Sequence, residues 1–215
     1  MNASNEITVI IPALNEEAAI QRTLGQVLRL ENVREIFVVD GGSVDGTVEI
    51  AERIGATVLI ERGVGWGKAV IRGLQEARGE FIAVIDADCT YDPSELPKLV
   101  ATLKSNDSIA AVVGSRPQIS LAMKIFATVF RLLFNRSIKD VTSSFIVARK
   151  DPVMDLELHS SDFSLSVEIL AKLINRGYIV AEVPVSYRRR LGERKLKLRH
   201  GFRILRRIIA SGFSL

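Results

Sequence analysis

Five short apolar runs, rich in β-branched residues, alternate with amphipathic segments over the first half of the chain. The runs lie at residues 6–14, 34–40, 56–61, 79–86 and 109–115. They do not alternate between polar and apolar residues, which indicates strands that are covered on both faces. The segments with helical periodicity lie at residues 16–30, 45–54, 66–77 and 94–103. This order predicts an α/β fold with a mostly parallel central sheet flanked by helices, and with ligands bound beyond the carboxyl ends of the strands.

The second half of the chain departs from this alternation after Arg116. Residues 121–135 form a nearly all-apolar helical stretch, 143–149 and 178–187 are typical of strands, and 164–177 is typical of an amphipathic helix closed by Gly177. The chain has 215 residues, and no repeat or long linker interrupts it. We therefore expect a single domain over residues 1–215.

Two carboxylates end the fourth predicted strand. Asp86 and Asp88 are separated by one residue, and alternate residues of a strand share a face, so both side chains are expected to point the same way. Two carboxylates placed together repel each other, and one stays protonated unless a cation lies between them. Hard oxygen ligands at an open strand end favour Mg²⁺ or Mn²⁺, which takes its remaining ligands from water and diphosphate oxygens.

Another acidic residue, Asp40, ends the second predicted strand. It is followed by two glycines, which form a tight turn whose backbone can approach a ligand closely. The spacing of the glycines matches neither the dinucleotide-binding pattern nor the P-loop. We expect Asp40 to contact a ribose hydroxyl or the edge of a base.

A basic segment lies near the C-terminus. Residues 188–207 contain ten Lys or Arg against one acidic residue, Glu193, although the net charge of the whole chain is only +4. The last predicted helix has an apolar stripe on one face and Arg203, Arg206 and Arg207 on the other. This pattern is typical of a helix that lies on an anionic membrane surface. The alternative interpretation is a last helix that docks on the domain.

Two other functions fit parts of this pattern less well. A nucleic-acid-binding protein would need stacking aromatic residues, and the basic segment offers only Tyr187 and Phe202, so we expect no nucleic-acid partner. A nucleotidyltransferase would also use Asp86 and Asp88 with a metal. It would, however, be expected to carry a glycine-rich basic signature at the first strand, where this chain has the acidic sequence IPALNEE. Both functions are kept as remote alternatives.

The cellular compartment is indicated by the cysteine content and by the N-terminal residues. The single cysteine, Cys89, excludes an intramolecular disulfide, and the first residues lack the basic flank and apolar core of a signal peptide. The apolar stretch 121–135 is shorter than the roughly 20 residues that span a bilayer, so it is either a core helix or an interfacial helix. We expect a cytoplasmic protein that is peripheral at the cytoplasmic face of the membrane.

Seven motifs, in order along nearly the whole chain, resemble those of the inverting nucleotide-sugar glycosyltransferases of family 2. They are IPALNEE, VVDGGSVDGT, GWGKAVIRGLQEARGE, VIDADCTYDP, GSR, DVTSSF and EVPVSYRRRLGERKLK. The last three resemble more narrowly the dolichyl-phosphate or polyprenyl-phosphate mannosyl- and glucosyltransferases. The resemblance implies a single-domain GT-A-type nucleotide-sugar-binding fold. In this fold residues 1–116 would bind the nucleotide-sugar, and residues 117–215 would form the acceptor half, with the basic amphipathic C-terminal helix.

The resemblance also implies roles for residues at the predicted strand ends. Pro12, Leu14 and Glu16 would line the nucleoside site, and Asp40 would hold the base or the ribose. The pair Asp86 and Asp88 would bind the metal that bridges the sugar-nucleotide diphosphate. The diphosphate or an acceptor phosphate would be handled by three basic residues, which are Arg116, Arg189 and Lys195.

The chain departs from the family pattern at three positions. Thr90 stands where relatives often have a glutamine that assists the metal, and Arg194 stands where a serine is usual before Lys195. In the segment DVTSSF, Asp140 matches the family pattern, whereas Ser144 replaces its glycine.

The acceptor decides whether a general base is required. A phosphate acceptor has a second pKa of about 6 and is mostly a dianion near neutral pH, so it is already a nucleophile. A hydroxyl acceptor on a glycan or a small molecule would need a base, and Asp140, Asp162 and Glu168 are the candidates.

The residues and the resemblance together indicate a metal-dependent inverting glycosyltransferase. We expect it to move one sugar, mannose or glucose, from a GDP- or UDP-sugar to a polyprenyl or dolichyl phosphate. A divalent metal and guanidinium groups would stabilise the negative charge that develops on the leaving diphosphate. A family 2 enzyme with a hydroxyl acceptor is the alternative.

Overall fold

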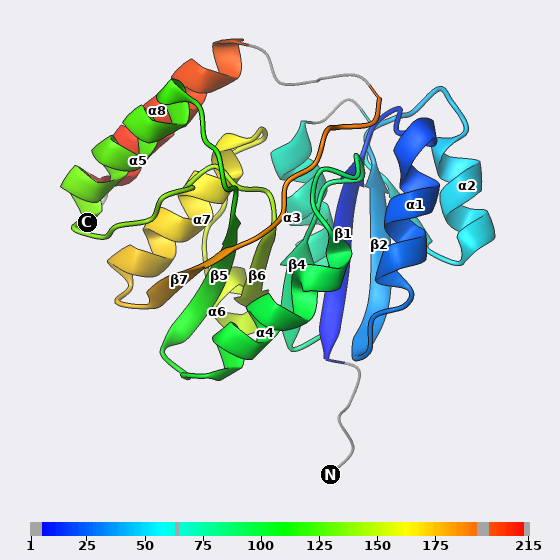
Figure 1. The fold of residues 1–215 in the computed structure, drawn as a ribbon, viewed down its shortest axis with the longest axis horizontal. Coiled ribbons are helices and arrows are strands. Elements are labelled where there is room, and N and C mark those ends of the chain that lie inside the picture. The colour runs from blue at the N-terminus through cyan, green and yellow to red at the C-terminus, as the bar shows by residue number, and fades with distance from the viewer. Residues whose placement is uncertain (1–5, 63–64, 193–197, 213–215) are drawn as a thin grey trace.

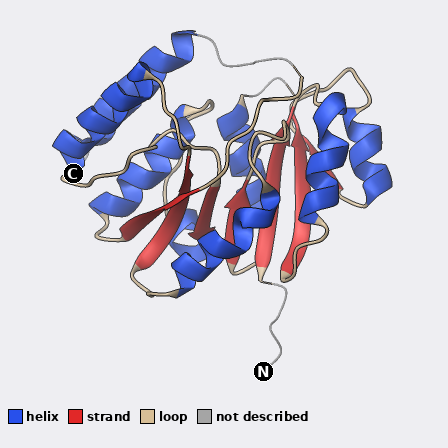
Figure 2. Ribbon diagram, viewed as in Figure 1, coloured by secondary structure: helices blue, strands red, loops and turns tan. Residues whose placement is uncertain are grey.

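The computed structural model describes residues 6–62, 65–192 and 198–212. These residues form a seven-stranded sheet with helices on both faces (Figures 1 and 2). The strands are β1 (Ile7–Ala13), β2 (Val33–Asp40), β3 (Thr57–Ile60), β4 (Phe81–Val84), β5 (Ile109–Ser115), β6 (Ile146–Arg149) and β7 (Ile179–Pro184). The helices are α1 (Glu17–Val27), α2 (Thr47–Ile54), α3 (Trp66–Glu76), α4 (Leu96–Lys104), α5 (Leu121–Phe134), α6 (Lys150–Met154), α7 (Ser164–Asn175) and α8 (Leu198–Gly212).

The order of the strands in the sheet is β3-β2-β1-β4-β6-β5-β7. Strand β6 runs antiparallel to both of its neighbours, β4 and β5, whereas the other pairs of neighbouring strands are parallel. The predicted mostly parallel α/β sheet is therefore confirmed. Because β6 is reversed, the residues that precede it lie at the same edge of the sheet as the carboxyl ends of the other strands.

Several helix boundaries follow from local sequence. The side chain of Ser120 caps α5 by accepting a hydrogen bond from Met123 N, and Asn135, which follows the last residue of α5, is in the left-handed conformation. Helix α2 ends at Gly55 with a φ of 95°, a conformation that glycine adopts without strain. Gly177, with a φ of 84°, follows α7 in the same way, as the sequence predicts.

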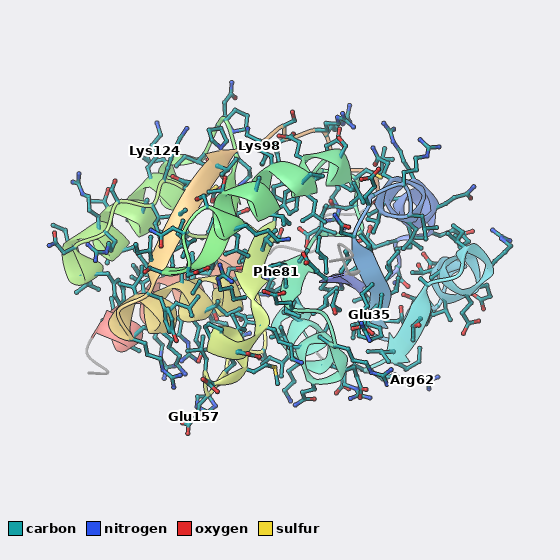
Figure 3. All side chains as sticks on the ribbon, turned by 90° about the horizontal axis from the view of Figure 1, so that it is seen from below. Glu35, Arg62, Phe81, Lys98, Lys124 and Glu157 are labelled. Atoms are coloured by element: carbon teal, nitrogen blue, oxygen red, sulfur yellow. The ribbon has the colours of Figure 1, made fainter. Side chains whose placement is uncertain are left out.

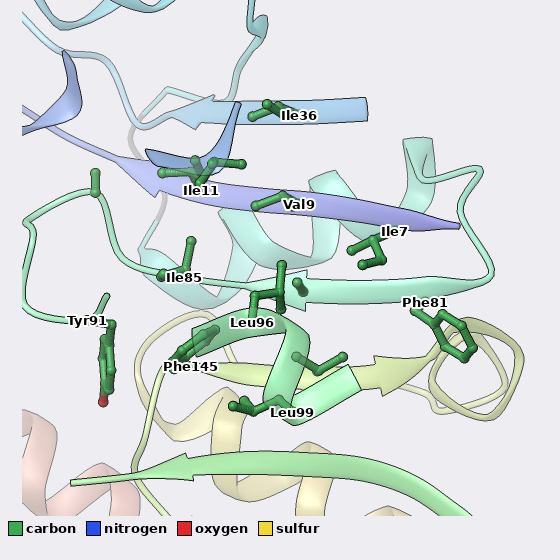
Figure 4. Close-up of a cluster of buried hydrophobic side chains, with 14 of the residues drawn as sticks. Ile7, Val9, Ile11, Ile36, Phe81, Ile85, Tyr91, Leu96, Leu99 and Phe145 are labelled. Carbon is green, nitrogen blue, oxygen red and sulfur yellow. The ribbon is translucent and has the colours of Figure 1, made fainter. Parts of the chain in front are cut away.

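The first hydrophobic core lies between the sheet and α1, α2 and α4. Alternate residues of β1, which are Ile7, Val9 and Ile11, point to this face and pack against side chains such as Leu24 and Leu99 (Figure 4). This layer covers one face of the sheet from β2 to β7, since the same cluster includes residues of β5, β6 and β7.

The second core lies on the opposite face, under α3, α6 and α7. Here Ile10 of β1 faces Gly73 of α3, and a Cβ atom at position 73 would be 2.6 Å from Ile10 Cγ2. Glycine is therefore required for the close approach of α3 to the sheet. Both faces of β1 are thus buried, which explains why its sequence is apolar without alternation.

Helices α5 and α8 lie side by side beyond α7, at the end of the sheet that carries β5 and β7 (Figure 1). The buried residues Phe126 and Phe130 of α5 pack in a third cluster with Ile204 and Ile208 of α8. The apolar stripe of α8 therefore docks on the domain, as the alternative interpretation held. Within the described ranges, no helix is long and apolar enough to cross a membrane.

The segment after β7 crosses the carboxyl edge of the sheet before the chain reaches α8 (Figure 1). Arg188 N donates a hydrogen bond to Thr90 O (2.8 Å), and Leu191 N donates to Asp88 O (3.1 Å). Tyr187 forms an isolated bridge with Tyr91. The segment is thus fixed to the loop that follows β4, where the sequence placed the paired carboxylates.

At the opposite edge of the sheet, β4 begins at Phe81. Figure 3 views the molecule from that side, with Phe81 well inside the outline. The ring of Phe81 is 2% exposed as part of the core. The cationic groups of Lys104 and Arg149 lie 5.1 and 5.7 Å from its centre. This edge therefore contributes to stability.

Candidate active site

A cavity of about 700 Å³ opens at the carboxyl edge of the sheet. Its polar lining includes Asp86, Asp88, Arg116, Ser144, Arg189 and Arg190, which come from segments that end or begin strands. Its apolar lining comes from the second half of the chain and includes Met123, Phe126, Phe163 and Ile204. The cavity therefore combines charged groups that could bind a polyanion and its counter-ion with an apolar wall.

The paired carboxylates lie beyond β4, in a turn, because the strand ends at Val84. Our expectation that alternation along a strand aligns them was therefore wrong in its geometry. Both carboxylates nevertheless line the cavity. The turn that presents them passes through Cys89, a residue in the left-handed conformation with a φ of 62°. The side chain of Asp88 is fixed by Thr90, whose amide and hydroxyl both donate to Asp88 Oδ1 (3.0 and 2.6 Å).

The Asp86 carboxylate accepts hydrogen bonds at both oxygens. Trp66 Nε1 donates to Oδ1 (2.9 Å), and the Ser144 hydroxyl donates to Oδ2. Burial and the negative charge of Asp88 raise the pKa of Asp86 to about 6, although the two hydrogen bonds oppose this shift. The charged form of Asp86 is therefore costly without a nearby cation.

A divalent cation fits this pair by the chemistry of its donors. Asp86 and Asp88 supply hard carboxylate oxygens in an open cavity, and their mutual repulsion is relieved by a positive charge between them. The described residues contain no group of three or more His, Cys, Asp or Glu side chains that could hold a metal. An ion at this pair would therefore take its other ligands from water and from a bound diphosphate.

Arg190 is a site residue that the sequence reasoning missed. Its Nη1 lies 2.6 Å from Asp88 Oδ2, and its Nη2 forms an ion pair with Glu16. Glu16 is 5% exposed and Asp88 is 3% exposed, so Arg190 places a cation between two buried carboxylates. The neighbouring Arg189 also lines the cavity, as the resemblance implies.

Arg116 and Asp140 form a buried, bidentate ion pair. Arg116 Nε and Nη2 each lie 2.6 Å from an Asp140 oxygen, and Thr142 Oγ1 accepts a further bond from Nη2 (2.8 Å). Burial alone would lower the pKa of Arg116, but Asp140 more than offsets it and the pKa is raised. Because Asp140 is 1% exposed and its oxygens are used by Arg116, its carboxylate holds the guanidinium at the cavity wall.

The other two candidate bases are also held by cations. Asp162 accepts from Arg203 Nη1 (3.0 Å). Glu168 lies 3.0 Å from Lys172 Nζ and 3.6 Å from Arg207 Nη1. Neither acid is among the residues that line the cavity. Arg203 and Arg207 thereby connect α8 with the start and the middle of α7, and none of the three candidate bases lines the cavity.

The residues expected at the nucleoside site surround the ends of β1 and β2. Pro12 is buried within β1, whereas Leu14 just beyond it is 37% exposed. Asp40 ends β2, is buried, and accepts hydrogen bonds from Gly42 N and Ser43 N (both 2.8 Å). Its carboxylate therefore shapes the glycine turn beside the predicted base site. Lys195, predicted to contact a phosphate, lies outside the described residues.

A mostly parallel seven-stranded sheet flanked by helices, with two carboxylates beyond β4 in a cavity at its carboxyl edge, is typical of GT-A-type glycosyltransferases. The chain matches the family model "glycosyl transferase family 2" over residues 8–150. It therefore belongs to glycosyl transferase family 2 and is an enzyme that transfers a sugar, as the motifs predict.

Two curated relatives are similar over most of the chain. A dolichyl-phosphate hexose transferase of Haloferax volcanii is 32% identical over 201 residues, covering 89% of this chain and 87% of the relative. A dolichol-phosphate mannosyltransferase of Pyrococcus furiosus is 33% identical over 224 residues, covering 94% of this chain and 62% of the relative. The predicted resemblance to the lipid-phosphate hexosyltransferases is thereby confirmed.

A solved structure supports the fold and the class of cofactor. Glucosyl-3-phosphoglycerate synthase from Mycobacterium tuberculosis, crystallised with Mn²⁺, UDP-glucose and glycerol 3-phosphate, superposes with a TM-score of 0.79 at 25% identity. The match covers 96% of this chain and 78% of the synthase. The predicted GT-A-type fold is confirmed, and the predicted Mg²⁺ or Mn²⁺ cofactor agrees with the Mn²⁺ in this relative.

Proposed function

We propose that this protein transfers one hexose, mannose or glucose, from a GDP- or UDP-sugar to a polyprenyl or dolichyl phosphate, with inversion at the anomeric carbon. The observation that carries the proposal is the composition of the cavity. It joins a carboxylate pair and three guanidinium groups to an apolar wall made by α5, α8 and Phe163. A metal-bound sugar diphosphate fits the carboxylate pair and the guanidinium groups, and a lipid phosphate fits the guanidinium groups and the apolar wall.

The donor is proposed to bind beyond β1, β2 and β4. Asp86 and Asp88 would hold a divalent metal, which supplies Lewis-acid stabilisation of the leaving diphosphate. Leu14, Asp40 and the glycine turn after β2 would receive the nucleoside. The surrounding helices would exclude water, so that the sugar passes to the acceptor and is not hydrolysed.

The acceptor phosphate is proposed to bind between Arg116 and Arg189. Arg116 is held rigidly by Asp140, and Arg189 reaches the same cavity from the segment after β7. A phosphate dianion would attack the anomeric carbon directly, so the absence of a candidate base among the described cavity residues is compatible with this acceptor. The lipid would leave along Met123, Phe126 and Ile204.

We also propose that the outer face of α5 and α8 rests on an anionic membrane surface on the cytoplasmic side. Leu121 and Leu132 of α5 are each 74% exposed, and Phe202 of α8 is 79% exposed. Lys124 and Arg206 are exposed on the same two helices. Apolar side chains for the acyl boundary and cations for the headgroups are thus presented beside the apolar wall of the cavity.

The test is a transfer assay with GDP-mannose, UDP-glucose and UDP-N-acetylglucosamine, each with Mn²⁺ and with or without a short polyprenyl phosphate. We expect labelled lipid with one donor, and no labelling by Asp88→Asn. Asp92→Asn, at a partly exposed acid on the same loop, is the matched control. Metal-dependent nucleotide binding without labelled lipid would contradict a lipid-phosphate acceptor and favour a hydroxyl acceptor.

Membrane binding has its own test. Vesicles that contain about one-third anionic lipid are expected to sediment the protein, and neutral vesicles are expected to leave it in solution. The double variant Leu132→Glu, Phe202→Glu should lose sedimentation while keeping metal-dependent nucleotide binding. Equal sedimentation by the double variant would contradict the proposed surface.

A further inference from the structure

Trp66 contacts Asp86, one of the paired carboxylates, from the start of helix α3. It is the first residue of α3, and its Nε1 donates a 2.9 Å hydrogen bond to Asp86 Oδ1. Ser144 donates to the other oxygen of the same carboxylate. Each oxygen of Asp86 therefore has a neutral donor, and together these donors fix the plane of the carboxylate.

The turn that carries Trp66 is held by close backbone packing. Gly67 N donates a hydrogen bond to Ser161 O (3.1 Å). A Cβ atom at Gly65 would clash with Ser161 O, and one at Gly67 would clash with Ser160 O. Glycine is therefore required on both sides of Trp66, and the indole begins from a fixed backbone position.

The indole ring itself is held by a stack of aromatic residues. Trp66 stacks on Phe163 with ring centres 5.6 Å apart and an interplanar angle of 22°. Phe163 in turn meets the edge of His200 on α8, also at 5.6 Å. The residue before Phe163, Asp162, forms an ion pair with Arg203 of α8. A continuous set of contacts thus connects α8 with Asp86.

We propose that Trp66 is a positioning residue, which orients the Asp86 carboxylate toward the metal and diphosphate of the bound donor. The proposal rests on the proposed function. The hydrogen bond from Trp66 uses one lone pair of Asp86 Oδ1 and leaves the other for a metal ion, and the stack on Phe163 holds the indole in place. Trp66 acts through Asp86, and it is not among the residues that line the cavity.

The substitution Trp66→Phe tests the hydrogen bond, because phenylalanine keeps an aromatic ring on Phe163 and removes the N–H donor. Calorimetry would measure Mn²⁺-dependent binding of GDP and UDP, metal-free binding of the same nucleotides, and the melting temperature. Loss of one bond to a charged group predicts Mn²⁺-dependent binding that is weaker by roughly tenfold. Metal-free binding and the melting temperature are expected to change little.

Trp66→His is the conservative variant, since histidine retains a ring N–H donor. We expect it to recover part of the Mn²⁺-dependent binding. Equal binding by wild type and Trp66→Phe would overturn the role of Trp66 and leave the proposed function intact. Parallel loss of metal-free binding would also overturn it, because that result indicates a purely structural role. No Mn²⁺-dependent binding in the wild type would instead contradict the proposed function.

The intrinsic fluorescence gives an independent readout. Trp66 is the single tryptophan of the chain, so the tryptophan emission reports directly on the indole that contacts Asp86. Titration of the nucleotide-bound wild type with Mn²⁺ is expected to shift or quench this emission at the concentration at which calorimetry detects binding. Emission that does not change while calorimetry detects Mn²⁺ binding would count against the proposed positioning role of Trp66.

Discussion

The guanidinium group of Arg190 lies 2.6 Å from the Asp88 carboxylate, across 102 residues of sequence. The same group reaches Glu16, so the single positive charge of Arg190 is shared by two buried acids from the first half of the chain. The protein thus supplies a positive charge of its own, from Arg190, to the carboxylates of the site. A divalent metal at Asp88 would compete with it for the same oxygen.

This competition predicts the behaviour of Arg190→Ala. Removal of the cation that faces two buried carboxylates should lower the free energy of unfolding by about 1–3 kcal/mol in the absence of metal. Mn²⁺ should then raise the melting temperature of the variant more than that of the wild type. Differential scanning calorimetry with and without Mn²⁺ measures both effects.

Arg188→Ala is the control for this experiment. Arg188 pairs with Asp92 and its side chain is 46% exposed, so its loss should cost about 0–1 kcal/mol. Its response to Mn²⁺ should match that of the wild type. An identical Mn²⁺ response in the Arg190 and Arg188 variants would exclude competition at Asp88.

Arg189 and Arg203 are expected to differ sharply in their effect on catalysis. Arg189 lines the cavity, whereas Arg203 pairs with Asp162 on α8. Loss of a charge-assisted bond to phosphate predicts that Arg189→Ala raises KM for a phosphorylated acceptor by roughly 10- to 100-fold. Steady-state kinetics of Arg203→Ala should show a change smaller than about threefold. Equal losses would mean that the basic segment is only a nonspecific anchor.

Asp140→Asn tests whether Asp140 serves mainly to hold Arg116. The substitution leaves a buried guanidinium without its carboxylate, which should cost about 3–5 kcal/mol of stability, measured by urea unfolding. If Asp140 holds Arg116 in place, activity should fall without a change in the shape of the pH–rate profile. Loss of an ionisation from that profile, with stability unchanged, would instead identify Asp140 as a general base.

Asp86 predicts a pH dependence of stability in metal-free protein. Burial and the charge of Asp88 raise the pKa of Asp86 from an ordinary value of 3.8 to about 6 in the folded protein. The folded state therefore holds the proton more tightly than the unfolded state. The associated stability is complete below the unfolded pKa and is lost as pH rises through about 6.

Asp86→Asn removes this ionisation. The melting temperature of the variant relative to wild type should therefore rise between about pH 4 and about pH 7, on top of a constant offset from the altered hydrogen bonds. Calorimetry without divalent metal measures the difference. A difference that does not change with pH would show that Asp86 ionises normally.

The sequence predicted the sheet because both faces of its parallel strands are buried. Buried strands such as β1 and β5 require continuous apolar runs, and these are visible in a single sequence. Direction is harder to predict, because β6 has only four residues and its apolar composition suits either direction. The antiparallel course of β6, which brings Ser144 to the site, depends on pairing across the whole sheet.

Individual side chains at the site were predicted less completely than the elements that carry them. Arg189 and Arg190 are adjacent, and only the path of the segment after β7 decides which of them meets Asp88. The contact between Trp66 and Asp86 likewise depends on the packing of α3 against the loop before α7. A glycine on each side of Trp66 was the available signal, since flanking glycines indicate a close backbone approach.

The ion pair between Arg190 and Glu16 joins residues 174 positions apart in the sequence. Contacts between such distant residues form late in folding, because the intervening chain must first be ordered. During synthesis, the segments that contain Glu16 and Asp88 emerge from the ribosome well before the segment that contains Arg190. We therefore expect the sheet to be assembled before Arg190 reaches its acidic edge.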